Sequence, residues 1–523
     1  MTPRGAPDAV VIGAGPNGLV AANMLADAGW HVLVLEATAA PGGAVRSDRG
    51  VHPDHVNDLF SSFYPLAVAS PALRRLGLER WGLTWRHAPA VLAHPLPDGR
   101  CAVLHHDPEH TAAALEAFAP GDGDAWLRLV ARWDRLAPDL LDALLGPFPP
   151  LRRGAAVLRR LLPAADGLRL LRMLTLPARR LGDEEFAGPG GPLLLTGSAL
   201  HADLSPESAG SGAFGWLLTM LGQRYGWPVP AGGAGRLTDA LVRRLADRGG
   251  EVRCNTPVDR VLVRDGRCLG VRTADGEPVP ARRAVLADVP APALYGGLVD
   301  WADLPRRLRA DLRRFQWDHP TFKVDWALTR PVPWTAQAAA AAGTVHLADS
   351  RDHLTRYAAD LACGTVPRHP CAVFGQMTTA DPGRSPAGTE SAWAYTHLPR
   401  GAAGAAPPEA LADRLEAAVE RFAPGFRDTI AARRILPPAG LEALNPSLYR
   451  GALGGGTAAP HQQLVFRPVP GTGRPGTPVA GLYLASSSAH PGGGVHGACG
   501  ANAARAALHR ARWNPRVRSR TWP

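Results

Sequence analysis

Two short apolar runs separated by a helical pattern open the chain. Ala9–Ile12 and Val32–Leu35 contain no polar residue, which is typical of strands buried on both faces of a parallel sheet. Between them, residues 19–28 follow a helical pattern that ends at Gly29. This order predicts a strand–helix–strand unit at the N-terminus.

The loop between the first run and the helix carries the pattern Gly13-x-Gly15-x-x-Gly18, and the second run ends in Glu36. Gly13 permits a tight turn, Gly15 lets the backbone approach a pyrophosphate, and Gly18 lets the helix pack on the strand. The helix N-terminus offers free N–H groups and a partial positive charge to phosphates. Glu36 accepts hydrogen bonds from ribose hydroxyls and repels a 2′-phosphate, so NADP is disfavoured. The unit is predicted to bind a dinucleotide.

A helical pattern over residues 237–246 is followed by four β-type runs, at residues 251–254, 258–263, 269–273 and Ala284–Ala287. The dipeptides Asp265-Gly266 and Asp275-Gly276 lie between runs and are typical of hairpin turns. We therefore predict a helix followed by a small antiparallel meander.

A second strand–loop–helix pattern lies near the C-terminus. Residues 482–485 are apolar, residues 490–497 read HPGGGVHG, and an alanine-rich helical stretch follows. This arrangement turns another helix N-terminus and the backbone N–H groups of the loop toward an electron-rich ligand.

Composition narrows the choice of class. Hydrophobic residues make up 46% and charged residues 20% of the 523 residues, as in soluble globular proteins. No uncharged apolar run approaches the roughly 18–20 residues that a membrane-spanning helix needs. The net charge of +11 comes from 57 basic residues, of which one is Lys323 and the other 56 (57 − 1) are arginine. Such an arginine bias is weak evidence for nucleic acid, and we predict no nucleic-acid partner.

The six cysteines show no CxxC spacing. This argues against a zinc site and a redox-active dithiol, so no metal is predicted, and it favours a reducing cytoplasmic location.

Pro41-Gly42-Gly43-Ala44-Val45-Arg46 follows Glu36 closely. Together with Glu36 it resembles the ExxxxGGxxR extension of the flavoprotein superfamily that includes glutathione reductase, amine oxidases and phytoene desaturases. That resemblance implies FAD as the cofactor. The chain lacks a second dinucleotide fingerprint with a preceding strand, so one dinucleotide is predicted.

Nearly the whole chain resembles the phytoene (carotenoid) desaturase-like flavoproteins, nearest the branch named pyridine nucleotide-disulfide oxidoreductase domain-containing protein 2. The matching stretches are residues 197–218, 227–241, 322–328, 445–456 and 490–497. The resemblance implies an α/β fold, in which a Rossmann-like FAD-binding domain is interwoven with an α+β substrate domain. The expected FAD domain comprises residues 1–100, 226–300 and 455–523. The expected substrate domain comprises 101–225 and 301–454, with a helical, membrane-facing part near 125–182.

The fingerprint and the resemblance together indicate which residues hold FAD, with Val258 expected to contact adenine through its backbone. The expected cofactor contacts are Gly13, Gly15, Asn17, Gly18, Glu36, Gly42, Gly43, Arg46, Val258, Gly493, Gly494 and Val495.

The function expected from the resemblance is FAD-dependent oxidation of a C–C unit in a lipophilic polyene or alicyclic substrate, by hydride transfer to flavin N5. One alternative is amine-oxidase-like C–N oxidation that releases peroxide. Another is a flavoprotein whose FAD is structural and which acts by binding a partner.

Lys323 is the first catalytic candidate, because it is the lone lysine of an arginine-rich chain. It lies in a β-type alternation, FKVDWAL, that puts Lys323 and Asp325 on one face. A lysine can be partly neutral when desolvated, which an arginine cannot. The alternative interpretation is a structural lysine paired with Asp325.

His201 is the second catalytic candidate, with Asp203 as a further acid/base group in the same stretch. The alternative is that this stretch starts a helix capped by Asp203 or Ser205. His490 and His496 flank the C-terminal loop and either touch the flavin or bond within the loop. By resemblance alone, Gln463, Phe466 and Arg467 are expected at the junction of flavin and substrate.

Residues 151–182 contain eight arginines and one acid, Asp166, on a leucine-rich background. We interpret them as a basic amphipathic helix pair interrupted at Pro163 and Gly167. They form either a peripheral contact with an anionic membrane or a solvated cap over the substrate cavity. The expected location is cytoplasmic, with peripheral attachment to the inner face of the cell membrane.

Overall fold

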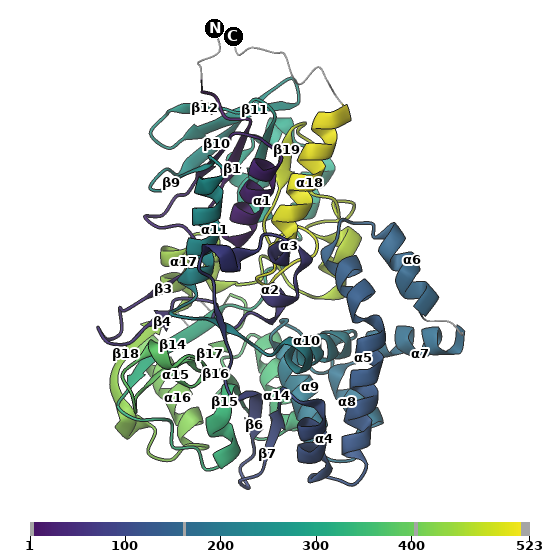
Figure 1. Ribbon diagram of the computed structural model, residues 1–523, viewed down its shortest axis with the longest axis vertical. Helices are drawn as coiled ribbons and strands as arrows, with labels where there is room; N and C mark the ends of the chain where they lie inside the picture. The colour runs from purple at the N-terminus through teal and green to yellow at the C-terminus, as the bar shows by residue number, and fades with distance from the viewer. Residues whose placement is uncertain (1–4, 161–163, 402–405, 514–523) are drawn as a thin grey trace.

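The computed structural model describes residues 5–160, 164–401 and 406–513 (Figure 1). Within these residues, five parallel strands form one sheet in the order β19-β13-β1-β2-β9. Their bounds are β1 Ala9–Ile12, β2 Val32–Leu35, β9 Glu251–Arg253, β13 Ala284–Ala287 and β19 Leu482–Leu484. The predicted N-terminal strand–helix–strand unit is confirmed, and strands from later parts of the chain flank it.

Each face of this parallel sheet is covered by a different layer. On one face, Val11, Val34 and Leu286 pack against three helices, α1 (Pro16–Asp27), α11 (Gly235–Asp247) and α18 (Ala498–Trp513). On the other face, Val10 and Leu33 pack against a small antiparallel sheet and the short helix α12 (Ala291–Ala293). Because alternate residues of a strand point to opposite faces, a fully apolar run is what two covered faces require.

The small antiparallel sheet consists of β10 (Val258–Arg264), β11 (Arg267–Thr273) and β12 (Pro278–Pro280). Asp265 and Gly266 both have positive φ, of +51° and +68°, as a two-residue hairpin turn requires. The predicted meander is thus confirmed for the runs at 258–263 and 269–273. It is wrong for the other two runs, because β9 and β13 join the parallel sheet, and the third antiparallel strand, β12, was not predicted. The fully apolar sequence of β13 explains its place, since an interior parallel strand is buried on both sides.

In the same described ranges, seven strands form a second, mixed sheet in the order β18-β14-β17-β16-β15-β6-β7. All neighbours are antiparallel except β15 and β6. The bounds are β6 Ala90–Pro95, β7 Cys101–Leu104, β14 Thr321–Leu328, β15 Ala342–Leu347, β16 Ala372–Gln376, β17 Glu390–His397 and β18 Ile430–Leu436. The two large sheets draw on alternating parts of the chain, which confirms the expected interwoven α/β architecture.

The second sheet also has two unlike faces. Phe322, Val324 and Trp326 of β14 pack into an apolar core shared with α16 (Pro408–Glu420). Lys323 and Asp325 therefore point to the opposite face, as the alternation predicted. That face is covered by α9 (Gly190–Leu200), α10 (Ser211–Tyr225) and α14 (Arg351–Ala362).

The remaining helices of this half lie beside the second sheet in Figure 1. They are α4 (Pro108–Glu116), α5 (Asp122–Leu145), α6 (Leu151–Arg160), α7 (Ala164–Thr175) and α8 (Ala178–Glu185). The predicted interruption at Gly167 is wrong, because α7 runs through it. Pro163 lies outside the described residues. Among the described helices, none is long and apolar enough to cross a membrane.

Short elements complete the described part of the fold. They are β3 (Ser47–Asp48), β4 (Asn57–Asp58), α2 (Pro65–Ala69), α3 (Pro71–Arg74), β5 (Trp85–Arg86), β8 (Val229–Pro230), α13 (Arg306–Leu312), α15 (Met377–Ala380) and α17 (Pro438–Leu444).

Candidate cofactor site and the neighbouring pocket

At two positions around the turn from β1 into α1, the backbone lies so close to other atoms that only glycine fits. Gly13 has φ of +92°, and a Cβ there would lie 2.8 Å from the carbonyl oxygen of Asp288. A Cβ on Gly18 would lie 2.2 Å from the carbonyl oxygen of Gly13. The helix consequently begins directly at the end of the strand, with Pro16 as its first residue.

Asp288, just after β13, is a candidate site residue that was not predicted from the sequence. One carboxylate oxygen of Asp288 accepts a hydrogen bond of 2.7 Å from Gly18 N at the start of α1. Burial raises the pKa of this carboxyl to about 7, with a smaller contribution from the charge of Glu36 and against the lowering effect of the hydrogen bond from Gly18 N. Near neutral pH a large fraction of Asp288 is thus uncharged and does not repel a phosphate. The signal that could have found it is an acid directly after a buried parallel strand, as at Glu36.

Glu36 lies between the first glycine loop and the segment that leads into β10. Its carboxylate accepts hydrogen bonds from Ala14 N (2.7 Å) and Thr38 N (2.9 Å), and the residue is 7% exposed. The backbone carbonyl of Glu36 accepts from Thr256 N at 2.8 Å. Val258 therefore starts β10 close to Glu36, where the resemblance expects the adenine contact.

Gly42 and Gly43 pack directly on the first glycine loop. Gly42 N donates to Ala14 O at 2.8 Å, and a Cβ on Gly43 would lie 3.0 Å from the Cα of Gly15. Arg46 closes this turn by donating to Gly43 O at 3.1 Å, and burial lowers the pKa of its guanidinium. The structure thus brings both predicted glycine patterns together.

The C-terminal loop, residues 490–497, lies next to the first two turns of α1. Gly493 and Gly494 are exposed and Val495 is partly buried. His496 caps α18, because its Nδ1 accepts from Ala498 N at 3.0 Å. A Cβ on Gly500 would lie 1.8 Å from Asn17 O, so α18 and α1 cross in backbone contact near their N-termini.

Several buried polar atoms around these loops have no hydrogen-bond partner within the described part of the chain. They include Asn17 Oδ1 at the start of α1 and both ring nitrogens of His490. Such atoms are costly to bury unsatisfied. Together with the glycine loops and Glu36, they fit a dinucleotide: the N-terminus of α1 would hold its phosphates, and the C-terminal loop would face its ring. Of the two interpretations of His490 and His496, bonding within the loop is what the structure shows for His496.

Lys323, on β14, lies next to β4, the second of the two short strands that follow Arg46. Its Nζ donates to Asp58 O in β4 at 2.8 Å and forms an ion pair with Asp325. Asp325 also accepts from Arg434 at 3.0 Å. Burial lowers the pKa of Lys323, and the neighbouring Asp325 opposes that shift. The pairing with Asp325 exists as one sequence interpretation proposed, and the role of Lys323 at the flavin stays a prediction.

A row of polar and aromatic side chains crosses the second sheet from Lys323. Lys323 is directly opposite Tyr395, and Tyr395 is opposite Val373, which is opposite His346. The next ring beyond His346 is His94, with centroids 6.3 Å apart. Strand pairing therefore connects the lysine to a group of buried histidines.

His201, at the C-terminal end of α9, contacts two residues of this row, His346 and Tyr395. It is the residue after α9, so the predicted helix start at residues 201–205 is wrong: the stretch ends a helix and turns, with Asp203 at φ of +60°. His201 Nε2 lies 2.7 Å from His346 Nε2, and His201 Nδ1 lies 3.2 Å from the Tyr395 hydroxyl. Burial lowers the pKa of His201 to about 4, so its imidazole is neutral at pH 7.

Asp203, the other predicted acid/base group, holds loops together. Its carboxylate accepts from His319 N (2.9 Å), Arg400 (2.8 Å) and Thr457 Oγ1 (3.0 Å). These bonds occupy both of its oxygens. Within the described residues, no group of three or more His, Cys, Asp or Glu side chains is arranged to hold a metal.

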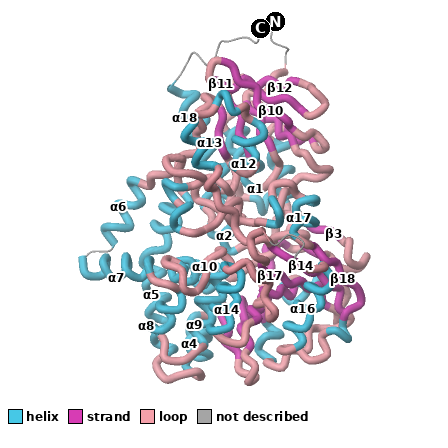
Figure 2. The backbone as a smooth tube through the Cα atoms, turned by 180° about the vertical axis from the view of Figure 1, so that it is seen from behind, coloured by secondary structure: helices cyan, strands magenta, loops and turns pink. Residues whose placement is uncertain are grey.

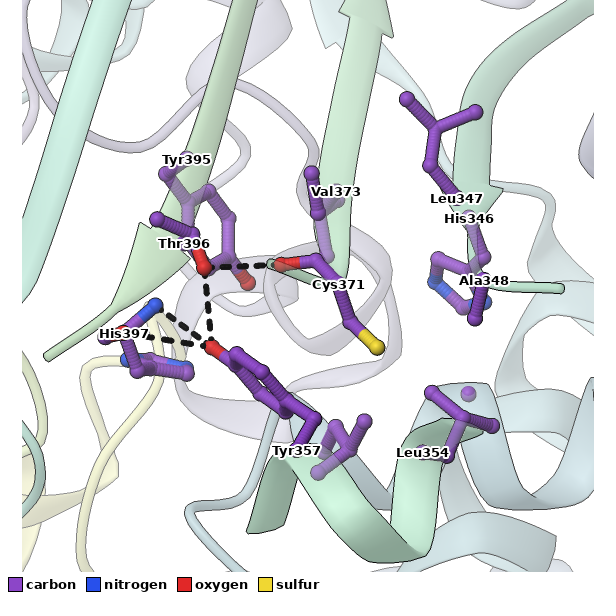
Figure 3. A pocket seen from close by; sticks show the side chains of 13 residues that line it. His346, Leu347, Ala348, Leu354, Tyr357, Cys371, Val373, Tyr395, Thr396 and His397 are labelled. Carbon is purple, nitrogen blue, oxygen red and sulfur yellow. Dashed lines mark hydrogen bonds between the residues drawn. The ribbon is translucent and has the colours of Figure 1, made fainter. Parts of the chain in front are cut away.

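A pocket opens beside Tyr395, between α9, α14 and the second sheet (Figure 3). Its volume is about 20 Å³, which is room for about one water molecule. Tyr357 of α14 points to its rim, where its hydroxyl lies 3.0 Å from Thr396 Oγ1 and accepts from His397 N at 2.7 Å. None of the described residues that line it is aspartate, glutamate, lysine or arginine.

Comparison with known proteins identifies the family and the fold of the chain. The family profile described as "Flavin containing amine oxidoreductase" matches residues 17–508. The chain is 30% identical to mouse (Mus musculus) "Pyridine nucleotide-disulfide oxidoreductase domain-containing protein 2", covering 95% of this chain and 92% of that protein. It is also 30% identical to "Hydroxyneurosporene desaturase" of Cereibacter sphaeroides, over 94% of each chain. An oxidoreductase structure from Methanosarcina mazei superimposes with a TM-score of 0.63 at 15% identity, over 96% of this chain and 99% of that one.

Proposed function

Because the chain belongs to the family of flavin containing amine oxidoreductases, and is therefore an FAD-dependent oxidoreductase, we propose that it desaturates a lipophilic substrate. The bond oxidised is a C–C unit of a polyene or alicyclic molecule. Bound FAD supplies the redox step by accepting a hydride. The protein's own side chains position the substrate, exclude water and manage the second proton.

The uncharged lining of the small pocket beside Tyr395, and not the size of that pocket, is the observation that carries this proposal. Its described lining offers apolar walls, tyrosine and histidines but no charged side chain. Such a lining suits a neutral, lipophilic molecule better than an ammonium ion, because a cation loses its hydration without gaining a partner. The similarity to a protein named hydroxyneurosporene desaturase supports the same substrate class.

In this proposal, Lys323 and His201 manage charge and protons. Lys323 as an ammonium stabilises negative charge on the reduced cofactor; as a neutral amine it accepts a proton. His201 is neutral and in contact with Tyr395, so it accepts a proton through the Tyr395 hydroxyl.

A second candidate function is C–N oxidation with release of peroxide. Trp393 and Tyr395 of β17 support it, because their rings stack 5.9 Å apart at 17°. Lys323 Nζ lies 5.9 Å from the Trp393 ring centroid. Parallel aromatic rings attract a substrate nitrogen that carries a positive charge.

Anaerobic reduction of the bound FAD separates the candidates. The purified protein is mixed with polyenes, alicyclic terpenoids and primary amines, and bleaching of the flavin absorbance is followed. We expect bleaching by a polyene or alicyclic compound and no peroxide with amines. Bleaching by amines, with peroxide formed in air, would favour C–N oxidation. FAD that no compound reduces favours a structural cofactor in a partner-binding protein.

We also propose that α6 and α7 contact an anionic membrane from the cytoplasmic side, which would bring a lipophilic substrate to the enzyme. These helices stand out from the rest of the molecule in both views (Figures 1 and 2). Leu151, Leu168 and Leu171 are 76%, 68% and 61% exposed. Arg152 and Arg159 are exposed on the same helix pair, and exposed leucines beside arginines are typical of an interfacial helix.

Vesicle sedimentation tests this contact. We expect the protein to sediment with vesicles of anionic lipid, and less at high salt because surface charges are screened. Arg152→Gln with Arg159→Gln should weaken binding about 30-fold, at about 1 kcal/mol per arginine near the surface. Arg307→Gln is the matched control, since Arg307 is an 86% exposed side chain on α13, away from α6 in Figure 2. Equal binding to neutral and anionic vesicles contradicts the proposal.

A further inference from the structure

Arg384 and Arg467 are both fully buried, but their surroundings differ. Arg384 has carboxylate partners, with Asp58 at 3.0 Å and Asp381 at 3.1 Å. Arg467 donates to backbone carbonyl oxygens instead, at 2.7 Å to Ser487 and at 3.0 Å to Thr457. In the described part of the chain, no carboxylate lies within ion-pair distance of Arg467.

A buried guanidinium without a paired carboxylate is energetically costly. Carbonyl dipoles satisfy its N–H groups but do not cancel its charge. Burial lowers the pKa of Arg467 to about 10, so the group still carries its charge at neutral pH. The result is a fixed positive charge in a region of low dielectric, where it acts strongly on nearby charges.

This charge lies against the C-terminal glycine loop. A Cβ on Gly492 would lie 3.2 Å from Arg467 Nε. His490, whose ring nitrogens have no partner in the described part of the chain, is in the same loop, and Gly493 and Gly494 follow as exposed residues.

We propose that Arg467 stabilises the negative charge that the bound flavin acquires when it is reduced. Two electrons and one proton convert oxidised flavin into its anionic reduced form, so the net charge at the ring falls by one. A preorganised positive charge near that ring favours the reduced form over the oxidised one. The N-terminus of α18 acts in the same direction. This inference rests on the FAD cofactor and not on the proposed substrate.

Asp318 provides a matched control, because it holds the loop of residues 453–456, to which Arg467 also bonds. Its carboxylate accepts from Leu453 N and Gly454 N, both at 2.7 Å. Arg467 donates to the carbonyl oxygen of that same Gly454 at 2.9 Å. Asp318→Asn therefore loosens the loop while removing a negative charge, whereas Arg467→Gln loosens it while removing a positive one.

The midpoint potential of the bound FAD, measured with a chemical reductant and a reference dye, tests the proposal without any substrate. Arg467→Gln should lower the affinity for reduced relative to oxidised flavin about tenfold. That is about 30 mV for a two-electron couple. Sulfite, which adds to flavin N5 and leaves a negative charge on the ring, should bind this variant about tenfold more weakly. Arg467→Lys keeps the charge and should stay near the wild-type potential, and Asp318→Asn should leave the potential unchanged or raise it.

The opposite results overturn the proposal. An Arg467→Gln protein with the wild-type potential shows that the arginine only holds the loop. An equal lowering by Asp318→Asn shows the same. If Arg467→Gln does not retain FAD, the comparison of Arg467→Lys with Asp318→Asn decides: a lysine variant lowered well below the wild-type potential contradicts a role for the charge.

Discussion

Glu36→Arg is expected to abolish FAD binding. Hydrogen bonds to a charged group are worth about 1.5–3 kcal/mol each, and every 1.4 kcal/mol is a factor of ten in affinity. The substitution removes the ribose acceptor and adds a cation that has no partner among the described neighbours Ala14, Thr38 and Thr256. We expect affinity for FAD to fall more than 100-fold, measured by fluorescence quenching of FAD titrated with apoprotein.

Two further variants separate loss of binding from loss of folding. Glu36→Gln keeps an acceptor oxygen and should weaken FAD binding about tenfold with the fold intact. Glu251→Arg makes the same substitution on the neighbouring strand β9, at an exposed position directly opposite Leu33, and should retain FAD. Full FAD content in Glu36→Arg, or bound NAD in its place, would rule out the assigned role of Glu36.

The dinucleotide-binding unit could be predicted from sequence because its signals are local. The apolar run of β1, the glycine loop and the pattern of α1 follow one another directly, and each has one physical interpretation. Gly13 and Gly18 then lie in contact with each other through the turn alone. A segment of about 30 residues thus contains the signals from which the strand–helix–strand unit is predicted.

Sheet membership and the second half of the site depend on distant pairings and could not be predicted in this way. β13 pairs with β1 across more than 270 residues of chain, and only this pairing brings Asp288 to the start of α1. Lys323, Tyr395 and His346 share one row because β14, β17, β16 and β15 pair in a particular register. No local sequence pattern specifies that register. The alternation in FKVDWAL did correctly predict that Lys323 and Asp325 point to the same face of the sheet.

His201 illustrates a different limit. Short polar residues at 201–205 are typical of a helix start, yet the preceding helix ends there and its last turn leads into Asp203 at positive φ. Polar residues that cap helices also favour turns. The hydrogen bond between His201 and His346 depends on α9 lying over the second sheet, which is again a distant contact.

Lys323→Met and Lys323→Arg are both expected to retain FAD and to slow its reduction about 100-fold, the size of a lost general acid–base contribution. Methionine removes the charge and the proton. Arginine keeps the charge but cannot release a proton, and its planar fork is bulkier. The measurement is anaerobic stopped-flow reduction, or photoreduction followed by reoxidation in air until a substrate is known.

Folding of these variants is favoured by the surrounding ion pairs. Asp325, the partner of Lys323, keeps Arg434 as a second partner, with bonds of 3.0 and 3.2 Å. Losing the lysine consequently does not leave a buried carboxylate without a cation. Thermal unfolding of both variants should stay cooperative.

Asp325→Asn distinguishes a lysine that acts at the flavin from one that only holds the sheet. Asp325 raises the pKa of Lys323 against the lowering effect of burial, so removing that charge lowers the pKa further. The ammonium form then disappears at lower pH, and the pH profile of flavin reduction should shift to lower pH while the rate at its optimum stays within about tenfold of wild type. If Lys323 is structural, Asp325→Asn and Lys323→Met instead lose stability together and leave the profile unshifted. In that case Lys323→Arg reduces and reoxidises at the wild-type rate.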